Sequence, residues 1–221
     1  MIELINYLSG EKIIIVCGHY GTGKTNIAVN LAVKLKEQAG YMYTLVDLDI
    51  VNPYFRSADN IDDLQKLGID CIVPQFANTN VDIPAIPTAI YSIFTDNARS
   101  IIDVGGDNGA IVLGMFADKI KALDYEMIFV VNKYRNLISN IEDAAELAKI
   151  IEEKSKLKIT SVINNSNIGN LTTEREILGS IDYAEKVSDR LNVPLIATTS
   201  IIKCINCENT IQINNYTKQL F

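Results

Sequence analysis

The stretch most able to do chemistry is GHYGTGKT at 18–25, which follows the apolar run KIIIVC. Gly18, four intervening residues, Gly23, Lys24 and Thr25 match the phosphate-loop pattern, which requires a strand before it and a helix after it. The glycines let backbone N–H groups converge on phosphate oxygens, the lysine reaches the β- and γ-phosphates, and the threonine hydroxyl ligates Mg²⁺. A simple glycine turn needs neither side chain. We therefore predict nucleotide contacts from Gly18, Gly21, Thr22, Gly23, Lys24, Thr25 and Asn26.

Carboxylates at the ends of two later apolar runs are candidates for handling Mg²⁺ and water. Asp47 and Asp49 end the run TLVDLD, and Asp103 ends the run SIID. In parallel α/β sheets, ligands collect at the carboxyl ends of the strands, so these side chains should face the phosphate loop. Phosphoryl transfer needs a positioned cation, hydrogen-bond donors and an oriented nucleophile, which such carboxylates help to provide. Asp47 and Asp49 could instead cap a helix or form a turn before Pro53, and that alternative stays open.

Apolar, β-branched runs alternate with helical patterns along the whole chain. They predict strands at 13–17, 43–47, 70–73, 100–104, 127–131, 159–163 and 194–198. Several runs are apolar on successive residues, which is typical of parallel strands covered on both faces. No linker divides the 221 residues. We therefore expect an α/β fold, a single P-loop nucleotide-binding domain over 1–221, with a mostly parallel sheet of about seven strands flanked by helices on both faces. Residues 204–221 should form a tail or a last helix.

Capping patterns predict where some of the helices begin and end. The helix after the phosphate loop should end at Gly40, because glycine readily takes the left-handed conformation of a helix end. Ser139 and Glu142 form a capping-box pattern, which predicts the start of a second helix. Thr173 and Glu176 predict a third helix in the same way.

The chain resembles the MinD/ParA branch of P-loop NTPases, the group that also holds the CobQ/CobB-type synthetases, the nitrogenase iron protein and the Mrp-type iron–sulfur carriers. The resemblance spans nearly the whole chain and is carried by GHYGTGKT, VDLDIVNPYF, IIDVGGD, VVNKYRNLISNIEDAAELA and VINNSN. In the family these are the phosphate loop, the first switch, the second switch, the following strand and helix, and the base-recognising asparagine. The resemblance implies a Mg²⁺-dependent ATP-binding protein that hydrolyses ATP slowly and changes shape or partners with nucleotide state.

The resemblance also implies roles for single residues. Lys24, Asp49 and Asp103 would be catalytic, with Asp49 positioning the attacking water. Thr25, Asp49 and Asp103 would form the Mg²⁺ site, with Asp103 acting through water. Gly106 would donate its N–H group to the γ-phosphate.

Asn165 is implied as the contact to the nucleotide base. Its amide offers a donor and an acceptor together, which suits an adenine edge. The run NKYR at 132–135 lacks the aspartate of the Asn-Lys-x-Asp run that recognises guanine in many GTPases. We therefore expect ATP rather than GTP. Asn164 and Asn165 could also form only a turn, since asparagine tolerates positive φ.

One position departs from the family pattern. ParA-type loops carry a second lysine directly after the first glycine, and it reaches across a nucleotide-bound dimer to the partner's phosphates. Here that residue is His19. An imidazole gives a weaker and pH-dependent contact. A nucleotide-dependent homodimer therefore stays open, and His19 adds weight to the synthetase branch, which does without this lysine. A switch that uses His19 or another cation is not excluded, and His19 could equally be an ordinary loop residue.

Two further functions remain as alternatives to an ATPase switch. A CobQ/CobB-type synthetase would use ATP on a small carboxylate or amide, in a pocket lined by residues 78–94, although the apolar residues of that segment could equally form a helix that fills the core. An Mrp-like iron–sulfur carrier would use the Cys-x-x-Cys pair Cys204 and Cys207. Two thiolates from each of two subunits would hold a [4Fe–4S] cluster or a zinc ion. In a reducing cytosol the pair could equally be two free thiols.

Charge and composition exclude other classes of partner. The net charge of −7 argues against sequence-independent nucleic-acid binding, which needs clustered lysine and arginine. No apolar run approaches the roughly 20 residues that cross a bilayer. The stretch CENTIQINNYTKQLF at 207–221 lacks the basic amphipathic helix of MinD-type proteins, and the N-terminus lacks a secretory signal. We expect a cytoplasmic protein with no nucleic-acid or membrane partner and an unknown protein client or small-molecule substrate.

Overall fold

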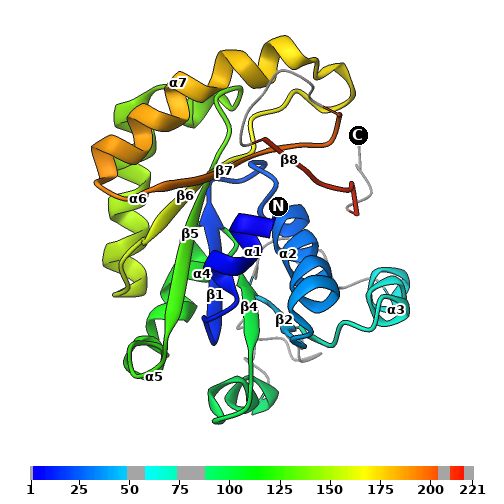
Figure 1. Cartoon of the computed structure of the whole chain (residues 1–221). Coiled ribbons are helices and arrows are strands. Elements are labelled where there is room, and N and C mark those ends of the chain that lie inside the picture. The colour runs from blue at the N-terminus through cyan, green and yellow to red at the C-terminus, as the bar shows by residue number, and fades with distance from the viewer. Residues whose placement is uncertain (1, 49–57, 74–87, 204–209, 217–221) are drawn as a thin grey trace.

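One eight-stranded sheet forms the centre of the protein (Figure 1). The computed structural model describes residues 2–48, 58–73, 88–203 and 210–216. The sheet has the order β3-β2-β4-β1-β5-β6-β7-β8, and every neighbouring pair is parallel. The strands are β1 Ile13–Gly18, β2 Thr44–Asp47, β3 Cys71–Ile72, β4 Ser100–Asp103, β5 Tyr125–Val131, β6 Ser161–Asn164, β7 Leu195–Ser200 and β8 Thr210–Gln212.

The predicted α/β fold is confirmed, and each of the seven predicted strands is present as β1 to β7. The additional strand, β8, lies within the segment expected to be a tail or a last helix. Of its three residues only Ile211 is buried, and it pairs with Thr199 of β7. A single buried apolar residue gives no alternation that could distinguish a strand from a loop. The sheet edge supplied by β7 therefore decides this conformation.

Helices cover both faces of the sheet, as the sequence predicts. Figure 1 shows α1 in front of β1 and α4 behind it. Residues of α1 and α2 form one core cluster with Ile14 and Val16, and residues of α4 to α7 form the other with Ile13 and Ile15. The helices are α1 Ile2–Leu8, α2 Lys24–Ala39, α3 Ala58–Lys66, α4 Gly106–Gly114, α5 Ala117–Lys121, α6 Ile141–Ser155 and α7 Glu174–Leu191. Short 3₁₀ helices are η2 Thr88–Phe94, η3 Asn136–Ile138 and η4 Gly169–Leu171.

Two of the three predicted helix ends are confirmed. Gly40 ends α2 in the left-handed conformation, with φ of 71°. The capping box of Thr173 and Glu176 starts α7, with both of its hydrogen bonds present. The third prediction is wrong by one residue, because Asn140 rather than Ser139 caps α6. The Ser139 hydroxyl donates to a carbonyl of the preceding 3₁₀ turn, so the next residue is left to accept the Asp143 N–H.

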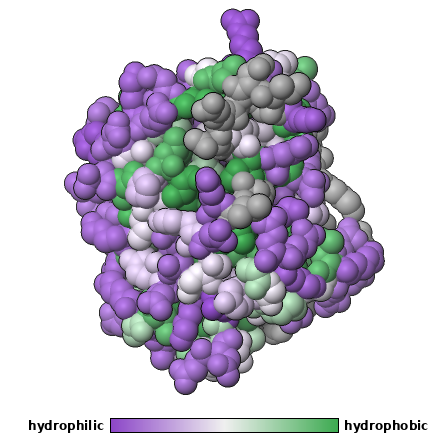
Figure 2. All heavy atoms as spheres, in the orientation of Figure 1, coloured by the Kyte–Doolittle hydropathy of each residue, from purple (hydrophilic) through white to green (hydrophobic). Residues whose placement is uncertain are grey.

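The surface is mainly polar where the helices meet solvent. Figure 2 shows hydrophilic side chains around the rim of the viewed face, with hydrophobic residues between them. No helix among the described residues is long and apolar enough to span a membrane.

The parallel arrangement brings several chemically important strand ends to one edge. Because all eight strands run the same way, the carboxyl ends of β1, β4, β6 and β7 lie along the same edge of the sheet. These ends carry Gly18, Asp103, Asn164 and Ser200. In open α/β sheets, ligands bind at this edge.

Candidate functional site

The predicted phosphate loop connects β1 to α2 and contains three glycines with positive φ. Gly18, Gly21 and Gly23 have φ of 142°, 77° and 87°. A Cβ atom on Gly18 would lie 2.5 Å from the Val130 carbonyl oxygen, and one on Gly23 would clash with the Asn165 amide. Only glycine combines these backbone conformations with such close neighbours. The structure thus explains why glycine occurs at each of these positions.

The loop is held in shape by its own side chains. The Thr22 hydroxyl donates to the His19 carbonyl oxygen at 2.9 Å, and Lys24 Nζ donates to the same oxygen at 3.0 Å. Thr22 is fully buried, and Lys24 is 7% exposed. Burying an ammonium group is costly unless anions or carbonyl oxygens compensate it. The His19 carbonyl oxygen offsets part of this cost for Lys24, the predicted phosphate-binding lysine, whose side chain folds back onto the loop.

Thr25 connects the phosphate loop to Asp103, the predicted carboxylate at the end of β4. Its hydroxyl donates to Asp103 Oδ2 at 2.5 Å. Asp103 ends β4, and its register partner on β2 is Asp47; both side chains are buried. Hydroxyl and carboxylate oxygens are hard donors, and Mg²⁺ commonly uses one or two such ligands together with water and substrate phosphates. The donor set of Thr25 and Asp103 therefore fits Mg²⁺.

Asn165 lies behind the phosphate loop and supports it. Its Nδ2 donates to the Thr22 carbonyl oxygen at 2.7 Å, and its Oδ1 accepts from the Thr199 hydroxyl at 2.8 Å. Each amide end can make one further hydrogen bond. The predicted contact from Asn165 to the base thus stays a prediction, and the structure adds a second role, as a brace between β6, β7 and the loop.

Asn26, the last residue of the predicted nucleotide-binding set in α2, has its side chain directed to the C-terminal segment 213–216. Its Nδ2 donates to the Asn214 carbonyl oxygen at 3.0 Å, and its Oδ1 accepts from Tyr216 N–H at 2.9 Å. Asn30, one turn later, makes a pair of hydrogen bonds with Asn214 at 2.8 and 2.9 Å. The Asn26 side chain is therefore used structurally, which leaves its backbone N–H for the predicted phosphate contact.

Gly106 begins α4 directly beyond the end of β4, with φ of 50°. Apart from adjacent residues and the backbone of its own helix, no heavy atom lies within 4 Å of a Cβ placed at Gly106. A larger side chain would therefore not clash at this position. The conformation favours glycine instead, because few other residues adopt this φ. The predicted donation from its N–H to a γ-phosphate is compatible with a position at a helix N-terminus.

Several predicted site residues lie outside the described residues: Asp49, Cys204 and Cys207. Cys17 and Cys71 are described, and burial raises the pKa of each thiol to about 12. A thiol with such a pKa carries almost no thiolate at neutral pH, and thiolate is the form that binds metals. Among the described residues, no group of three or more His, Cys, Asp or Glu side chains is arranged for a metal. The predicted cluster thus depends on Cys204 and Cys207.

Two residues at the site were not predicted. Thr199 orients Asn165 from the end of β7, and Arg135 lies against Gly21 of the phosphate loop. Thr199 lies at the carboxyl end of β7, and Arg135 follows the carboxyl end of β5. This position, where ligands bind in parallel sheets, is the one sequence signal that indicates either residue. Nothing in the local sequence distinguishes a threonine or an arginine that reaches the loop from one that faces solvent.

A glycine loop between a strand and a helix, a buried lysine and a threonine bonded to a strand-end carboxylate define a P-loop nucleotide-binding protein. Comparison with known families agrees. Residues 13–192 match the model of the CobQ/CobB/MinD/ParA nucleotide binding domain, and the chain belongs to this family. This confirms the resemblance inferred from the motifs. Curated proteins gave no significant match.

Solved structures similar to this chain share its fold at low sequence identity. Cell division protein FtsY from Thermotoga maritima is 18% identical with a TM-score of 0.51, over 86% of this chain and 61% of FtsY. A nucleotide-binding protein from Archaeoglobus fulgidus, in complex with ADP, is 15% identical with a TM-score of 0.51, over 89% and 85%. FlhF complexed with GMPPNP and Mg²⁺ is 15% identical with a TM-score of 0.50, over 86% and 66%. This chain thus spans less than two thirds of FtsY and FlhF.

Proposed function

We propose that this protein is a Mg²⁺-dependent ATPase of the MinD/ParA type, built as one nucleotide-binding domain, which couples its nucleotide state to its conformation and to binding of a protein client. The observation that carries the proposal is the hydrogen bond between Thr25 and Asp103. It joins the first turn of the helix after the phosphate loop to the strand that leads into the predicted second switch. A change at the phosphates can thereby reach the segment that follows β4.

Each residue of the proposed site has a distinct role in binding Mg²⁺, the phosphates or water. Bound Mg²⁺ would neutralise charge on the phosphate oxygens. Thr25 and Asp103 would hold it, Asp103 through water, together with Asp49. Lys24 would exchange its bond to the His19 carbonyl for the phosphates, and Gly106 would donate its N–H to the γ-phosphate. Asp49 would orient the attacking water.

ATP is proposed over GTP because Asn165 offers both a donor and an acceptor for adenine, and because the run NKYR lacks the aspartate of guanine-binding motifs. The similar structures include one with ADP and one with GMPPNP. They share only the fold with this chain, so affinity must be measured for both bases.

The test is direct measurement of nucleotide binding and hydrolysis. We expect the purified protein to bind ATP with Mg²⁺ more tightly than GTP and to hydrolyse ATP slowly. Lys24→Ala should weaken ATP binding by at least about 100-fold, because a charge-assisted contact to the phosphates is lost. Molecular mass, measured with and without a non-hydrolysable ATP analogue, would reveal a nucleotide-dependent dimer.

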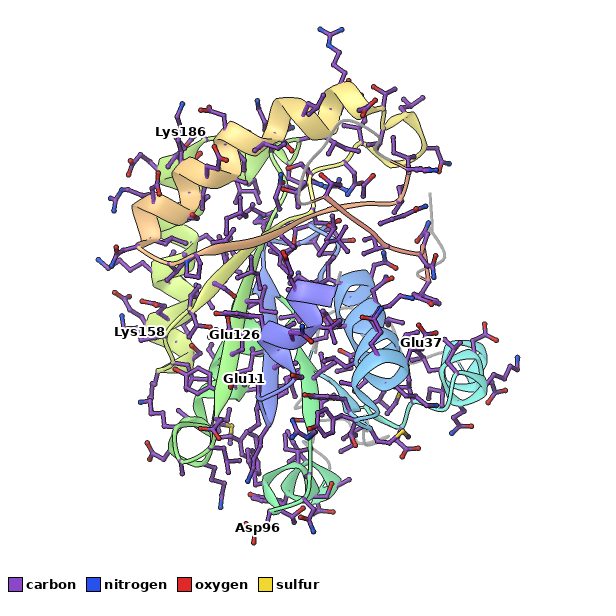
Figure 3. All side chains as sticks on the ribbon, viewed as in Figure 1. Glu11, Glu37, Asp96, Glu126, Lys158 and Lys186 are labelled. Carbon is purple, nitrogen blue, oxygen red and sulfur yellow. The ribbon has the colours of Figure 1, made fainter. Side chains whose placement is uncertain are left out.

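The matched control is Lys158→Ala. Lys158 is an exposed lysine just before β6, at the opposite edge of the sheet, where it pairs with Glu152 at 2.7 Å. Figure 3 labels it at the left of the view. This variant should bind and hydrolyse ATP like the wild type. Equal ATP affinity in the wild type and Lys24→Ala would contradict the proposal.

A second candidate, the ATP-dependent synthetase, is favoured by a hollow beside the phosphate loop. His19 lines it together with Leu137 and Ile138 of η3 and with residues of α6, and its volume is about 370 Å³. The segment 78–94 is expected either to line such a pocket or to form a helix that fills the core. Its described part, η2, buries Ile90 and Ile93 in the core, and 78–87 lie outside the described residues. Turnover that requires a small carboxylate or amide would favour the synthetase.

The iron–sulfur carrier rests on Cys204 and Cys207 alone. Anaerobic purification tests it, because a [4Fe–4S] cluster would make the protein brown, with absorbance near about 400 nm. Cys204→Ser should then abolish the colour, whereas Cys71→Ser should retain it. A colourless protein without iron would rule this function out.

A further inference from the structure

Arg135 lies in the loop after β5, and its side chain rests on the phosphate loop. A Cβ atom built on Gly21 would lie 3.3 Å from both Cζ and Nε of Arg135, and 3.6 Å from Nη1. Three atoms of the guanidinium group therefore lie close to the middle of the loop. Gly21 has φ of 77°, so the loop turns sharply at the point where the arginine approaches.

The backbone that carries Arg135 is fixed by a buried asparagine. Asn132 is fully buried, and its Oδ1 accepts from the backbone N–H groups of Tyr134 and Asn167 at 3.0 and 3.3 Å. Its Nδ2 donates to the Asn167 carbonyl oxygen at 3.2 Å. The Arg135 N–H in turn donates to the Asn132 carbonyl oxygen at 3.1 Å. These hydrogen bonds hold the backbone at Arg135 in place, so only the arginine side chain has to be ordered when it binds.

The two residues before Arg135 use their side chains to hold this loop. Lys133 Nζ donates to the Gly179 carbonyl oxygen at 2.7 Å, and the Tyr134 hydroxyl donates to the Glu176 carbonyl oxygen at 2.7 Å. Both contacts tie the loop to α7. The Arg135 guanidinium makes no comparable hydrogen bond or ion pair within the described part of the chain, and its side chain is exposed. It differs from its neighbours in having its donors available.

We infer that Arg135 contacts the phosphates of the bound nucleotide from within the same chain, as an additional cation of the site. A guanidinium group keeps its charge at all physiological pH values and offers five N–H donors in a planar array that suits phosphate oxygens. The backbone N–H groups of the phosphate loop face the phosphates, so a guanidinium group against Gly21 borders the same anion. The inference rests on the proposed nucleotide-binding function and deepens it.

The contact is specific for charge, which separates it from a purely structural role. If Arg135 only packed against the loop, a neutral side chain of similar length would serve as well. Arg135→Gln keeps much of that length and its polarity but removes the charge, and Arg135→Lys keeps the charge without the planar donors. A phosphate contact therefore predicts the order wild type, then Lys, then Gln for nucleotide affinity.

The experiment is a titration of each purified variant with Mg·ADP and with a Mg-bound non-hydrolysable ATP analogue, at two salt concentrations. Arg135→Gln should bind the ATP analogue about 10- to 100-fold more weakly than the wild type, as expected for a lost hydrogen bond between charged groups. Its affinity should also depend less on salt, because one charge pair is missing. Arg135→Lys should recover part of the affinity. The unfolding midpoint without nucleotide should stay unchanged, and Lys158→Ala serves again as the control.

The possible outcomes separate this inference from the proposed function. If the wild type binds the analogue, Lys24→Ala does not, and Arg135→Gln binds as tightly as the wild type, then the inference is overturned and the proposed function stands. If the wild type binds no nucleoside triphosphate, both are overturned. Weaker binding by Arg135→Gln together with a lower unfolding midpoint of the free protein would assign Arg135 to loop structure and also overturn the inference.

Discussion

The Thr25 hydroxyl donates a hydrogen bond to Asp103 Oδ2 across 2.5 Å, although the two residues are 78 positions apart in the chain. Thr25 belongs to the first turn of α2, and Asp103 ends β4. In the proposed Mg²⁺ site Thr25 would bind the ion directly and Asp103 through water, and these two residues already face one another. Metal binding then requires little rearrangement of the described residues.

Replacing Thr25 tests this pair. Thr25→Ala removes one Mg²⁺ ligand and the donor to Asp103, and we expect Mg²⁺-dependent ATP binding to weaken about 10- to 100-fold. Thr25→Ser retains the hydroxyl and should stay within a few-fold of the wild type. Titration with ATP at increasing Mg²⁺ concentrations measures the effect. Similar Mg²⁺ dependence in Thr25→Ala and the wild type would argue against the assigned ligand.

The brace between Asn165 and the phosphate loop can be weakened in two steps. Asn165→Ala leaves the Thr22 carbonyl oxygen without its donor, and it should lower nucleotide affinity and cost about 1–3 kcal/mol of unfolding free energy. Thr199→Val removes only the hydroxyl that orients the amide, so its effect should be smaller. Comparing ATP with GTP for both variants shows whether Asn165 also contacts the base, because only then does the preference change as well as the affinity.

Gly18 provides a test of the loop geometry itself. Gly18→Ala should lower the unfolding free energy by about 2–4 kcal/mol, because φ of 142° is strained for alanine and the new Cβ meets the Val130 carbonyl oxygen. Gly10→Ala is the control, since nothing lies within 4 Å of a Cβ at that position. Urea unfolding of both variants gives the comparison. Equal midpoints would mean that the β1 end relaxes without cost.

Glu11 is expected to destabilise the fold at neutral pH. Burial, together with the nearby carboxylates of Glu126 and Asp124, raises the pKa of Glu11 above the ordinary 4.5, and Arg99 opposes this effect. Figure 3 shows Glu11 and Glu126 next to α1, where the Tyr7 hydroxyl donates to Glu126 at 3.2 Å. Because the folded protein holds the Glu11 proton more tightly than the unfolded chain, stability falls as the pH rises through the raised pKa.

Glu11→Gln removes that charge. We expect its thermal unfolding midpoint at pH 7 to be about 1–3 °C higher than that of the wild type. The difference should shrink as the pH is lowered toward 4.5, where the wild-type side chain also becomes neutral. A thermal unfolding series across this pH range measures the trend. A difference that is independent of pH would assign the effect to packing instead of charge.

The sequence predicts most of the sheet because its strands are buried on both faces and therefore consist of apolar runs such as IIIVC and MIFVV. The phosphate loop can also be predicted from the sequence, because its local geometry requires the glycines, Lys24 and Thr25 at fixed spacing. Asn165 was predicted from its place in the family pattern. Its bond to Thr22 was not, because two residues 143 positions apart meet only through the order of the strands.

The features that the sequence did not predict depend on neighbours distant in the chain. β8 forms because β7 offers it an edge, and Arg135 matters because the loop after β5 folds toward Gly21. Asn140 caps α6 in place of the predicted Ser139, because the Ser139 hydroxyl donates to a carbonyl oxygen of the preceding 3₁₀ turn. In each case the residue type allows several local structures, and tertiary contacts select one of them.

The hydrogen bonds from Asn26 and Asn30 to the segment 213–216 have a consequence for biosynthesis. Asn26 and its partner Asn214 are 188 positions apart. At about 5–20 residues per second, roughly 10–40 s of translation separate the appearance of the two ends of this contact. Until then the buried side-chain amides of Asn26 and Asn30 lack their backbone hydrogen-bond partners at Asn214 and Tyr216. The helix that follows the phosphate loop can therefore reach its native environment only after the ribosome has released residues 213–216, so the nucleotide site cannot be complete before this segment emerges.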